Sequence, residues 1–111
     1  MFTRIVELTA KPGKNKQLSD TINDKVLPIL KRQRGFVDEA VSVSDKEDNR
    51  VLGLSFWNTK EDAELYRRLE YQKVHETLRH LLESEPVIRT FNVHASTSHK
   101  IAAGKAAGSR A

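Results

Sequence analysis

The sequence of 111 residues contains no cysteine, and this absence excludes several classes of site at once. Disulfide frameworks, thiolate metal sites, iron–sulfur clusters and cysteine nucleophiles all require thiols. A reducing compartment is therefore permitted, and we expect a cytoplasmic protein. A long hydrophobic run is also missing from the N-terminal end, because the first ten residues alternate in polarity and include Arg4 and Glu7. We expect neither a signal peptide nor a membrane span.

Acidic residues are missing from the C-terminal end, and this explains the positive net charge. The chain has 19 Lys and Arg against 15 Asp and Glu, which gives +4. Three of the basic residues, Lys100, Lys105 and Arg110, lie in a tail without acids, so residues 1–94 carry 16 minus 15, or +1. A surface that binds phosphates needs clustered Lys and Arg, so this nearly neutral body predicts no nucleic-acid partner.

Hydrophobic periodicity divides the chain into six elements in the order strand, helix, strand, strand, helix, strand. The expected strands span 2–10, 36–44, 51–57 and 87–94, and the expected helices span 15–34 and 59–85. This order is typical of the ferredoxin-like α+β fold, in which a four-stranded antiparallel sheet carries both helices on one face. We therefore expect one domain over residues 1–94. Residues 95–111 form a tail of small and basic residues that cannot make its own core and that a partner subunit could order.

Local signals predict where the two helices begin, bend and end. Pro28 removes a backbone donor inside the first helix, which predicts a kink or a tightened last turn there. Thr59 followed by Asp62 predicts a capped start for the second helix. A break in the apolar spacing near Glu70 predicts that this helix bends or divides in two.

The alternation within the strands predicts one apolar face and one mixed face for the sheet. The apolar face, which we expect to pack against the helices, contains Phe2, Val6, Leu8, Val37, Val41, Val43, Leu52, Leu54, Phe56, Val87, Phe91 and Val93. The mixed face contains Thr3, Ile5, Glu7, Thr9, Asp38, Ala40, Ser42, Ile88, Thr90, Asn92 and His94. A mixed face is either solvated or covered by a second copy of the chain.

Five segments together resemble the antibiotic biosynthesis monooxygenase (ABM) domain family over residues 1–94. They are the first strand ending in KPGK at 11–14, VLPILKRQRGF at 26–36, FWNTKEDAELY at 56–66, YQKVHETL at 71–78 and VIRTFNV at 87–93. Members of this family are ferredoxin-like units that associate sheet against sheet into a dimeric α/β barrel. The resemblance therefore implies a homodimer through the sheet face and a small-molecule ligand.

The resemblance also implies a chemistry. ABM-like oxygenases work without metal, flavin or haem, which implies that no cofactor is bound. An electron-rich aromatic substrate, once deprotonated, can itself pass an electron to oxygen, while the protein supplies a dry pocket, hydrogen-bond donors and a proton acceptor. We therefore expect a cofactor-independent monooxygenase acting on a small aromatic or quinol-type substrate. The alternative is a non-catalytic homodimeric ligand-binding or stress-related protein of the same architecture, so whether the chain is an enzyme stays open.

The family motifs match this chain in part. Quinone-forming members use an asparagine four residues before a strand-ending tryptophan, and an arginine late in the second helix. Trp57 matches the tryptophan, Gly53 stands at the asparagine position, and Arg79 falls within one or two residues of the arginine. At the three positions that serve haem-degrading members, the chain has Val6, Tyr66 and Glu76. Haem breakdown is therefore not expected.

His75 and Arg79 are the candidate catalytic residues. Imidazole titrates near neutral pH, which suits proton transfer, and His75 lies roughly 70° from the centre of the apolar stripe of its helix, at the edge of the buried face. Arg79 follows one turn later on the same side, so both could address one anionic group of a substrate. The structural alternatives are a half-exposed surface histidine and an arginine paired with Glu76 or Glu83.

Trp57, Tyr66 and Tyr71 are the candidate substrate-binding residues. The two tyrosines flank the apolar stripe, where their hydroxyls could face a cavity or their rings could simply fill the core. Trp57 ends its strand and could either wall a pocket or plug the end of the barrel. His75 and His80 are five residues apart, which points their rings in different directions around a helix, so no metal site is predicted.

Overall fold

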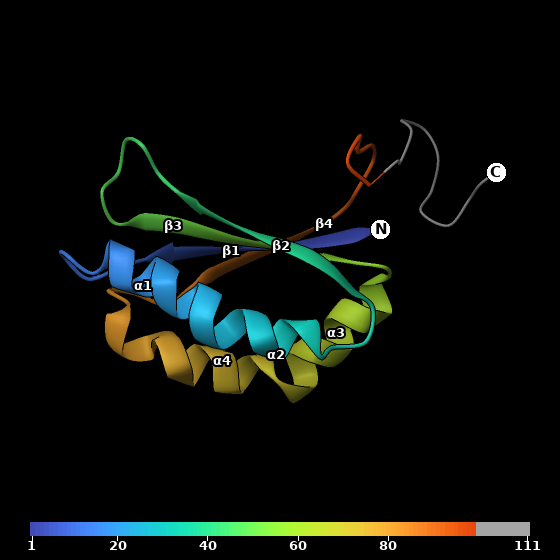
Figure 1. Ribbon diagram of the computed structural model, residues 1–111, viewed down its shortest axis with the longest axis horizontal. Helices are drawn as coiled ribbons and strands as arrows, with labels where there is room; N and C mark the ends of the chain where they lie inside the picture. Colours follow the sequence, from blue (N-terminus) through green and yellow to red (C-terminus); the bar gives the residue numbers. More distant parts are fainter. Residues whose placement is uncertain (100–111) are drawn as a thin grey trace.

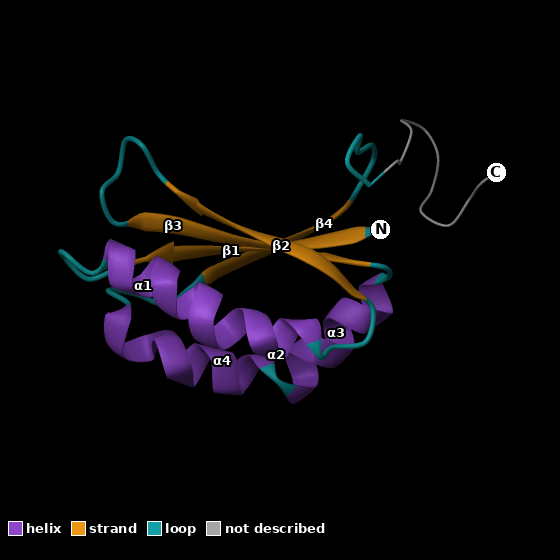
Figure 2. Cartoon of the chain, in the orientation of Figure 1, coloured by secondary structure: helices purple, strands orange, loops and turns teal. Residues whose placement is uncertain are grey.

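A four-stranded antiparallel sheet carries the helices on one of its two faces in the computed structural model, which describes residues 1–99 (Figure 1). In chain order the elements are β1 (Phe2–Thr9), α1 (Asn15–Thr21), η1 (Ile22–Val26), α2 (Leu27–Lys31), β2 (Phe36–Val43), β3 (Arg50–Trp57), α3 (Lys60–Leu69), α4 (Tyr71–Leu78), η2 (Arg79–Leu81) and β4 (Val87–Asn92). The strands lie in the order β2-β3-β1-β4, so β1 and β3 are central. This two-layer arrangement confirms the predicted ferredoxin-like α+β fold (Figure 2).

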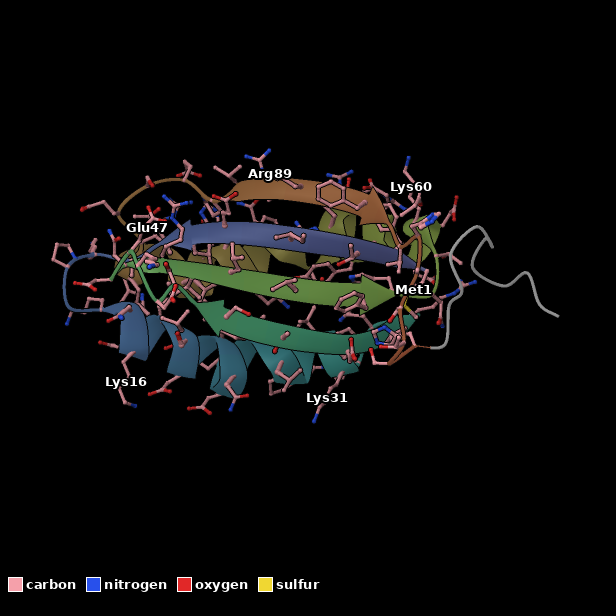
Figure 3. The ribbon with its side chains drawn as sticks, turned by 90° about the horizontal axis from the view of Figure 1, so that it is seen from above. Met1, Lys16, Lys31, Glu47, Lys60 and Arg89 are labelled. Carbon is pink, nitrogen blue, oxygen red and sulfur yellow. The ribbon has the colours of Figure 1, made fainter. Side chains whose placement is uncertain are left out.

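The pairing of β1 with its neighbours decides which side chains share a face, since directly opposed residues of antiparallel strands point the same way. Phe2 lies opposite Trp57 and Asn92, and these three side chains are on the side of the helices. The other side of the sheet, which we call the open face, is seen from above in Figure 3. It consists of Thr3, Ile5, Glu7, Asp38, Ala40, Ser42, Leu52, Leu54, Phe56, Val87, Arg89 and Phe91.

The predicted faces are correct for β1 and wrong for β3 and β4. Leu52 and Phe56 lie on the open face, whereas Val51 and Trp57 are fully buried under the helices. The alternation of β3 favours the wrong phase, because the open-face residues Leu52, Leu54 and Phe56 are together more apolar than the helix-facing set, which includes Gly53 and Ser55. Phe91 of β4 likewise lies on the open face, where it is 50% exposed. The open face is therefore more apolar than the sequence predicts.

The first helix runs without interruption from Asn15 to Lys31 but widens in its middle third. The Leu27 N–H donates to the Ile22 carbonyl five residues back, which is the hydrogen bond of a π-helix. Pro28 has no N–H to continue the α-helical pattern, and the wider turn just before it accommodates this loss. The predicted kink or tightened turn is thus replaced by a π-helical segment.

The second helix begins and divides where the sequence predicts. The Asp62 N–H donates to the Thr59 Oγ1 at 3.1 Å, which confirms the N-cap. Glu70, with φ of −125°, separates α3 from α4 and confirms the break. Asp62 also packs against Gly35, which has φ of +77° and where any Cβ would collide with the Asp62 side chain. This contact joins the turn after α2 to the start of α3.

The chain after β4 folds back over one end of the open face. The His99 Nε2 lies 2.9 Å from the Asp38 Oδ2, and the His99 ring lies 4.9 Å from that of Phe56, centroid to centroid. The beginning of the predicted tail thus contacts its own sheet, while residues 100–111 and their predicted ordering by a partner lie outside the described residues. Up to residue 99, no helix is long and apolar enough to cross a membrane.

Candidate functional site

A cavity of about 50 Å³ lies between the sheet and the helices. Most of its wall is apolar, and the wall is formed by the strands β1, β2 and β3, the helical segments η1, α2, α3 and α4, and the segment before β4. Its lining residues are Arg4, Val6, Leu8, Ile22, Val26, Leu30, Glu39, Gly53, Leu54, Ser55, Tyr66, Tyr71, Val74, His75, Leu78, Leu82 and Pro86. The polar groups that reach this apolar space are few, which is the usual composition of a small-molecule site.

Arg4 brings a positive charge into the cavity. It lies between Phe2 and Val6 on the helix-facing side of β1 and is only 4% exposed. Its guanidinium carbon is 4.3 Å from the ring centroid of Tyr71 and 5.5 Å from that of Tyr66. Its Nη2 is buried without a hydrogen-bond partner. Among residues 1–99 no carboxylate forms an ion pair with it.

Four aromatic rings run from the core to the edge of the helix layer. Trp57 stacks on Tyr66 with a centroid distance of 5.2 Å and an interplanar angle of 28°. Tyr66 meets Tyr71 edge to face at 6.4 Å, and Tyr71 stacks on His75 at 6.1 Å and 4°. Because these rings contact one another in series, the position of each ring depends on its neighbours.

Trp57 supports the cavity from behind and does not line it. The residue is fully buried, and its Nε1 donates to the Ser55 Oγ at 2.9 Å. Phe36 packs against its other side, edge to face at 5.7 Å. Of the two predicted alternatives, a pocket wall or a plug, the structure places Trp57 as a plug that holds Tyr66.

His75 lies where the helical spacing predicts, at the edge of the buried face, with its side chain 16% exposed. Its Nε2 is 3.6 Å from the Oε1 of Glu85, whose side chain is 84% exposed. Tyr71 and His75 line both the cavity and an open groove on the outside of the molecule. The rest of that groove is lined by Arg67, Arg68, Gln72 and Ile88. The stacked pair therefore lies between the cavity and the outer groove.

Arg79 does not lie at the cavity. Its side chain is 59% exposed, and its Nη2 is 2.7 Å from the Oε2 of Glu76, the surface pair that the sequence left open as an alternative. At about 100° per residue, Arg79 is turned roughly 40° further from the apolar stripe than His75, which directs it to solvent. The structure therefore does not bring His75 and Arg79 to one space, and their joint binding of an anionic group stays a prediction.

Glu39 is a second charged group that reaches the cavity from β2. A bulge between Phe36 and Asp38 shifts the alternation of this strand and places Glu39 opposite Ser55, on the side of the helices. Burial raises the pKa of the Glu39 carboxyl to about 6. This group therefore changes its charge just below neutral pH.

The two tyrosines of the cavity keep their protons at neutral pH. Burial raises the pKa of the Tyr66 hydroxyl, and the positive charge of Arg4 opposes that shift without cancelling it. Burial also raises the pKa of Tyr71, again against the effect of Arg4. Both hydroxyls are therefore available as hydrogen-bond donors to a ligand.

Arg4 and Glu39 were not predicted as site residues from the sequence. The signal for Arg4 was present, because Arg4 shares the two-residue period of Phe2, Val6 and Leu8 and so falls on the buried face. Glu39 had no such signal, since the bulge that turns it inward depends on pairing with β3. Gly53 also lines the cavity, and a Cβ built on it has no atom within 4 Å. In residues 1–99 no three His, Asp or Glu side chains are grouped as metal ligands would be.

Comparison with known proteins gives a family match and a set of similar folds. The family model described as antibiotic biosynthesis monooxygenase matches residues 1–78. No curated protein matches the chain. A Streptomyces coelicolor monooxygenase from the gene ActVA-Orf6, solved with nanaomycin D, is 15% identical, with a TM-score of 0.74 over 86% of this chain and 88% of that one.

Two further structures give the same result. SnoaB from Streptomyces nogalater, a cofactor-independent oxygenase solved as the N63A mutant, is 18% identical, with a TM-score of 0.71 over 86% of this chain and 95% of that one. A conserved protein from Methanosarcina mazei is 17% identical, with a TM-score of 0.67 over 82% and 91% of the two chains. At these identities the likeness shows a shared fold.

Proposed function

Because the chain belongs to the antibiotic biosynthesis monooxygenase family, we propose that it is a monooxygenase that oxidises a small aromatic or quinol-type molecule without a cofactor. The observation that carries this proposal is the cavity, where an apolar wall, aromatic rings and a half-buried histidine with an outlet to solvent meet. An electron-rich ring fits such a wall by size and polarity, and its hydroxyl needs a proton acceptor at the edge.

The reaction balances without an external reductant. A phenol and one O₂ give a quinone and one water: one oxygen atom enters the ring, the other leaves as water, and the ring supplies all four electrons. The protein has to take the phenolic proton, keep bulk water away from the reduced oxygen species and hold the ring in place. These tasks need only side chains that the cavity already contains.

His75 is the residue that we assign to proton transfer. Its ring lies in the cavity wall, and its Nε2 is 3.6 Å from the exposed carboxylate of Glu85. A proton taken from a substrate hydroxyl on the inner side can therefore pass to a surface carboxylate and to water. Tyr66 and Tyr71 would bound the ring of the substrate, and Trp57 would hold Tyr66 in place.

Entry of a substrate requires movement of the wall. An engineered apolar cavity of roughly 150 Å³ is known to accommodate benzene, and the present cavity is about 50 Å³. Tyr71 and His75 are the side chains that separate this cavity from the outer groove. A rotation of the Tyr71 ring would join the two spaces, and we include this opening step in the proposal.

The open face supports a homodimer as part of the same proposal. It exposes Phe91 and Val87 by 50% and 47%, next to the partly exposed Ile5, Leu54 and Phe56. All six residues of β4 are exposed, so this edge strand has little cover from its own chain. A contiguous apolar surface of this kind is typical of a protein interface, and a second copy sheet against sheet would cover it.

Oxygen consumption with a panel of phenols and hydroquinones tests the activity. We expect the wild type to consume oxygen and form a quinone, and His75→Gln to lower kcat roughly 100-fold or more. His80→Gln is the matched control, because His80 is exposed five residues further along the chain and should leave the rate unchanged. Equal rates in all three proteins would remove His75 from the reaction. Ligand binding without oxygen consumption would favour the non-catalytic alternative.

A further inference from the structure

Arg4 is a buried charge whose presence the fold does not explain. It is 4% exposed, lies on the most central part of the sheet and leaves its Nη2 without a partner. A guanidinium without a carboxylate partner is costly to bury, and an apolar side chain of similar length at this position would pack the same space without that cost. We therefore expect the charge of Arg4 to serve the binding of a ligand and not the stability of the fold.

The surroundings of Arg4 compensate its charge only in part. The rings of Tyr71 and Tyr66 lie at 4.3 Å and 5.5 Å from the guanidinium carbon, within the range of cation–π attraction. Glu39 lines the same cavity, but within residues 1–99 it forms no ion pair with Arg4. A guanidinium forms hydrogen bonds from the edge of its plane, and the Nη2 of Arg4 is buried there without a hydrogen-bond partner.

We propose that Arg4 binds the negatively charged oxygen of a small aromatic acid, so the cavity selects ligands that are anions when bound. The edge of a guanidinium forms strong hydrogen bonds with a carboxylate or a phenolate, and both are strengthened in an apolar space. The aromatic part of such a ligand would lie against the apolar wall that Val26, Leu30 and Val74 provide. This inference rests on the proposed function for the aromatic character of the ligand, while its charge follows from Arg4 alone.

Matched ligand pairs measure the selectivity directly. Titration calorimetry compares benzoate with benzamide and 4-nitrophenolate with 4-nitroanisole, so that each pair differs in charge and hardly in shape. We expect the wild type to prefer at least one anion over its neutral partner by tenfold or more. The pair in which the preference appears distinguishes a carboxylate ligand from a phenolate. Equal affinity within both pairs, or binding of none of the four, would overturn the inference.

Variants of Arg4 separate a ligand-binding role from a structural one. Arg4→Met should abolish the preference for anions and raise the thermal midpoint of the free protein by about 5 °C, because it removes a buried unpaired charge. A structural role predicts the opposite shift, a loss of stability. Arg4→Lys keeps the charge and should retain part of the preference, which gives a readout if the methionine variant folds poorly. Arg32→Gln, which removes an exposed arginine that does not line the cavity, is the control.

The result also distinguishes this inference from the proposed function. Anion-selective binding that depends on Arg4, without oxygen consumption, would support the inference and contradict the monooxygenase. Oxygen consumption at the wild-type rate by Arg4→Met would support the monooxygenase and contradict the inference. Retention of the full anion preference by Arg4→Met would contradict the inference whatever the activity.

Discussion

Each face of the sheet carries an exception to the usual distribution of polarity. The face under the helices contains a buried guanidinium and a cavity, and the open face carries half-exposed rings and aliphatic side chains. In a self-sufficient domain the charge would be outside and the apolar surface inside. Each face has a proposed partner that would remove its exception: an anionic small molecule for Arg4, and a second copy of the chain for Phe91 and its neighbours.

The largest effect that separates the two faces is expected from the aromatic core beneath the sheet. Trp57→Ala removes a fully buried ring that contacts Tyr66 and Phe36, so it should lower the free energy of unfolding by roughly 3–5 kcal/mol. Urea denaturation measures this loss. Phe91→Ala, at a ring that is 50% exposed on the open face, should cost less than about 1 kcal/mol at protein concentrations where the chain is a monomer. Similar losses for the two variants would contradict the distinction between the faces.

The second-largest effect is expected on self-association of the chain through the open face. Phe91→Lys introduces a charge into the proposed interface, so it should raise the dimer dissociation constant at least tenfold, or about 1.4 kcal/mol. Sedimentation velocity over a range of concentrations measures the change. Leu69→Lys is the control, because Leu69 is 63% exposed on α3, away from the sheet. A wild-type chain that is monomeric throughout the micromolar range would contradict the dimer, as would equal effects of the two variants.

A smaller effect is expected from the second charged group under the helices. The pKa of Glu39 is raised from 4.5 to about 6, so the folded state holds this proton more tightly than the unfolded state. The contribution of Glu39 to stability is therefore greatest below pH 4.5 and falls as the pH rises through 6, where the folded protein must carry a poorly solvated carboxylate. Glu39→Gln removes this cost and should stabilise the protein by about 1 kcal/mol at pH 7, after allowance for partial exposure.

Unfolding at several pH values checks the Glu39 prediction. The difference in unfolding free energy between wild type and Glu39→Gln should grow between pH 4.5 and 6 and stay constant above. Glu83→Gln, at an exposed acid near the end of the helices, is the control and should show no such difference. A wild type that gains stability over this pH interval relative to Glu39→Gln would show that Glu39 is stabilised as an anion.

The fold could be predicted from the sequence because the signals that determine it are local. The cap at Thr59, the break at Glu70 and the order of strands and helices depend on residues close together in the chain. The faces of β3 were not predictable in this way, because Val51 and Trp57 alternate with residues that are just as apolar. Only the pairing of Phe2 with Trp57, which are distant in sequence, decides between the two phases.

The candidate site was predictable only in part for the same physical reason. His75 and Tyr71 were found because helical spacing alone places them at the edge of the buried face. Arg79 lies one turn after His75, but its side chain points to solvent. A small rotation around the helix axis is enough to move a side chain from the edge of the cavity to the surface. Glu39 depends on a bulge in β2, and no pattern within its own strand reveals it.

The smallest effect concerns the floor of the cavity at Gly53. A Cβ at this position meets no atom within 4 Å, so Gly53→Ala adds a methyl group to empty space without a collision. Because glycine in a strand costs conformational entropy, the substitution should stabilise the fold by about 0.5 kcal/mol, which urea denaturation can resolve. The same methyl group takes up part of the cavity, so affinity for aromatic ligands should fall while stability rises. Gly35→Ala is the matched control with the opposite sign, since Gly35 has φ of +77° and contacts Asp62. If Gly53→Ala instead destabilised the protein and left ligand affinity unchanged, the space beside Gly53 would not belong to the binding site, and the polar groups of the covered face would need another explanation.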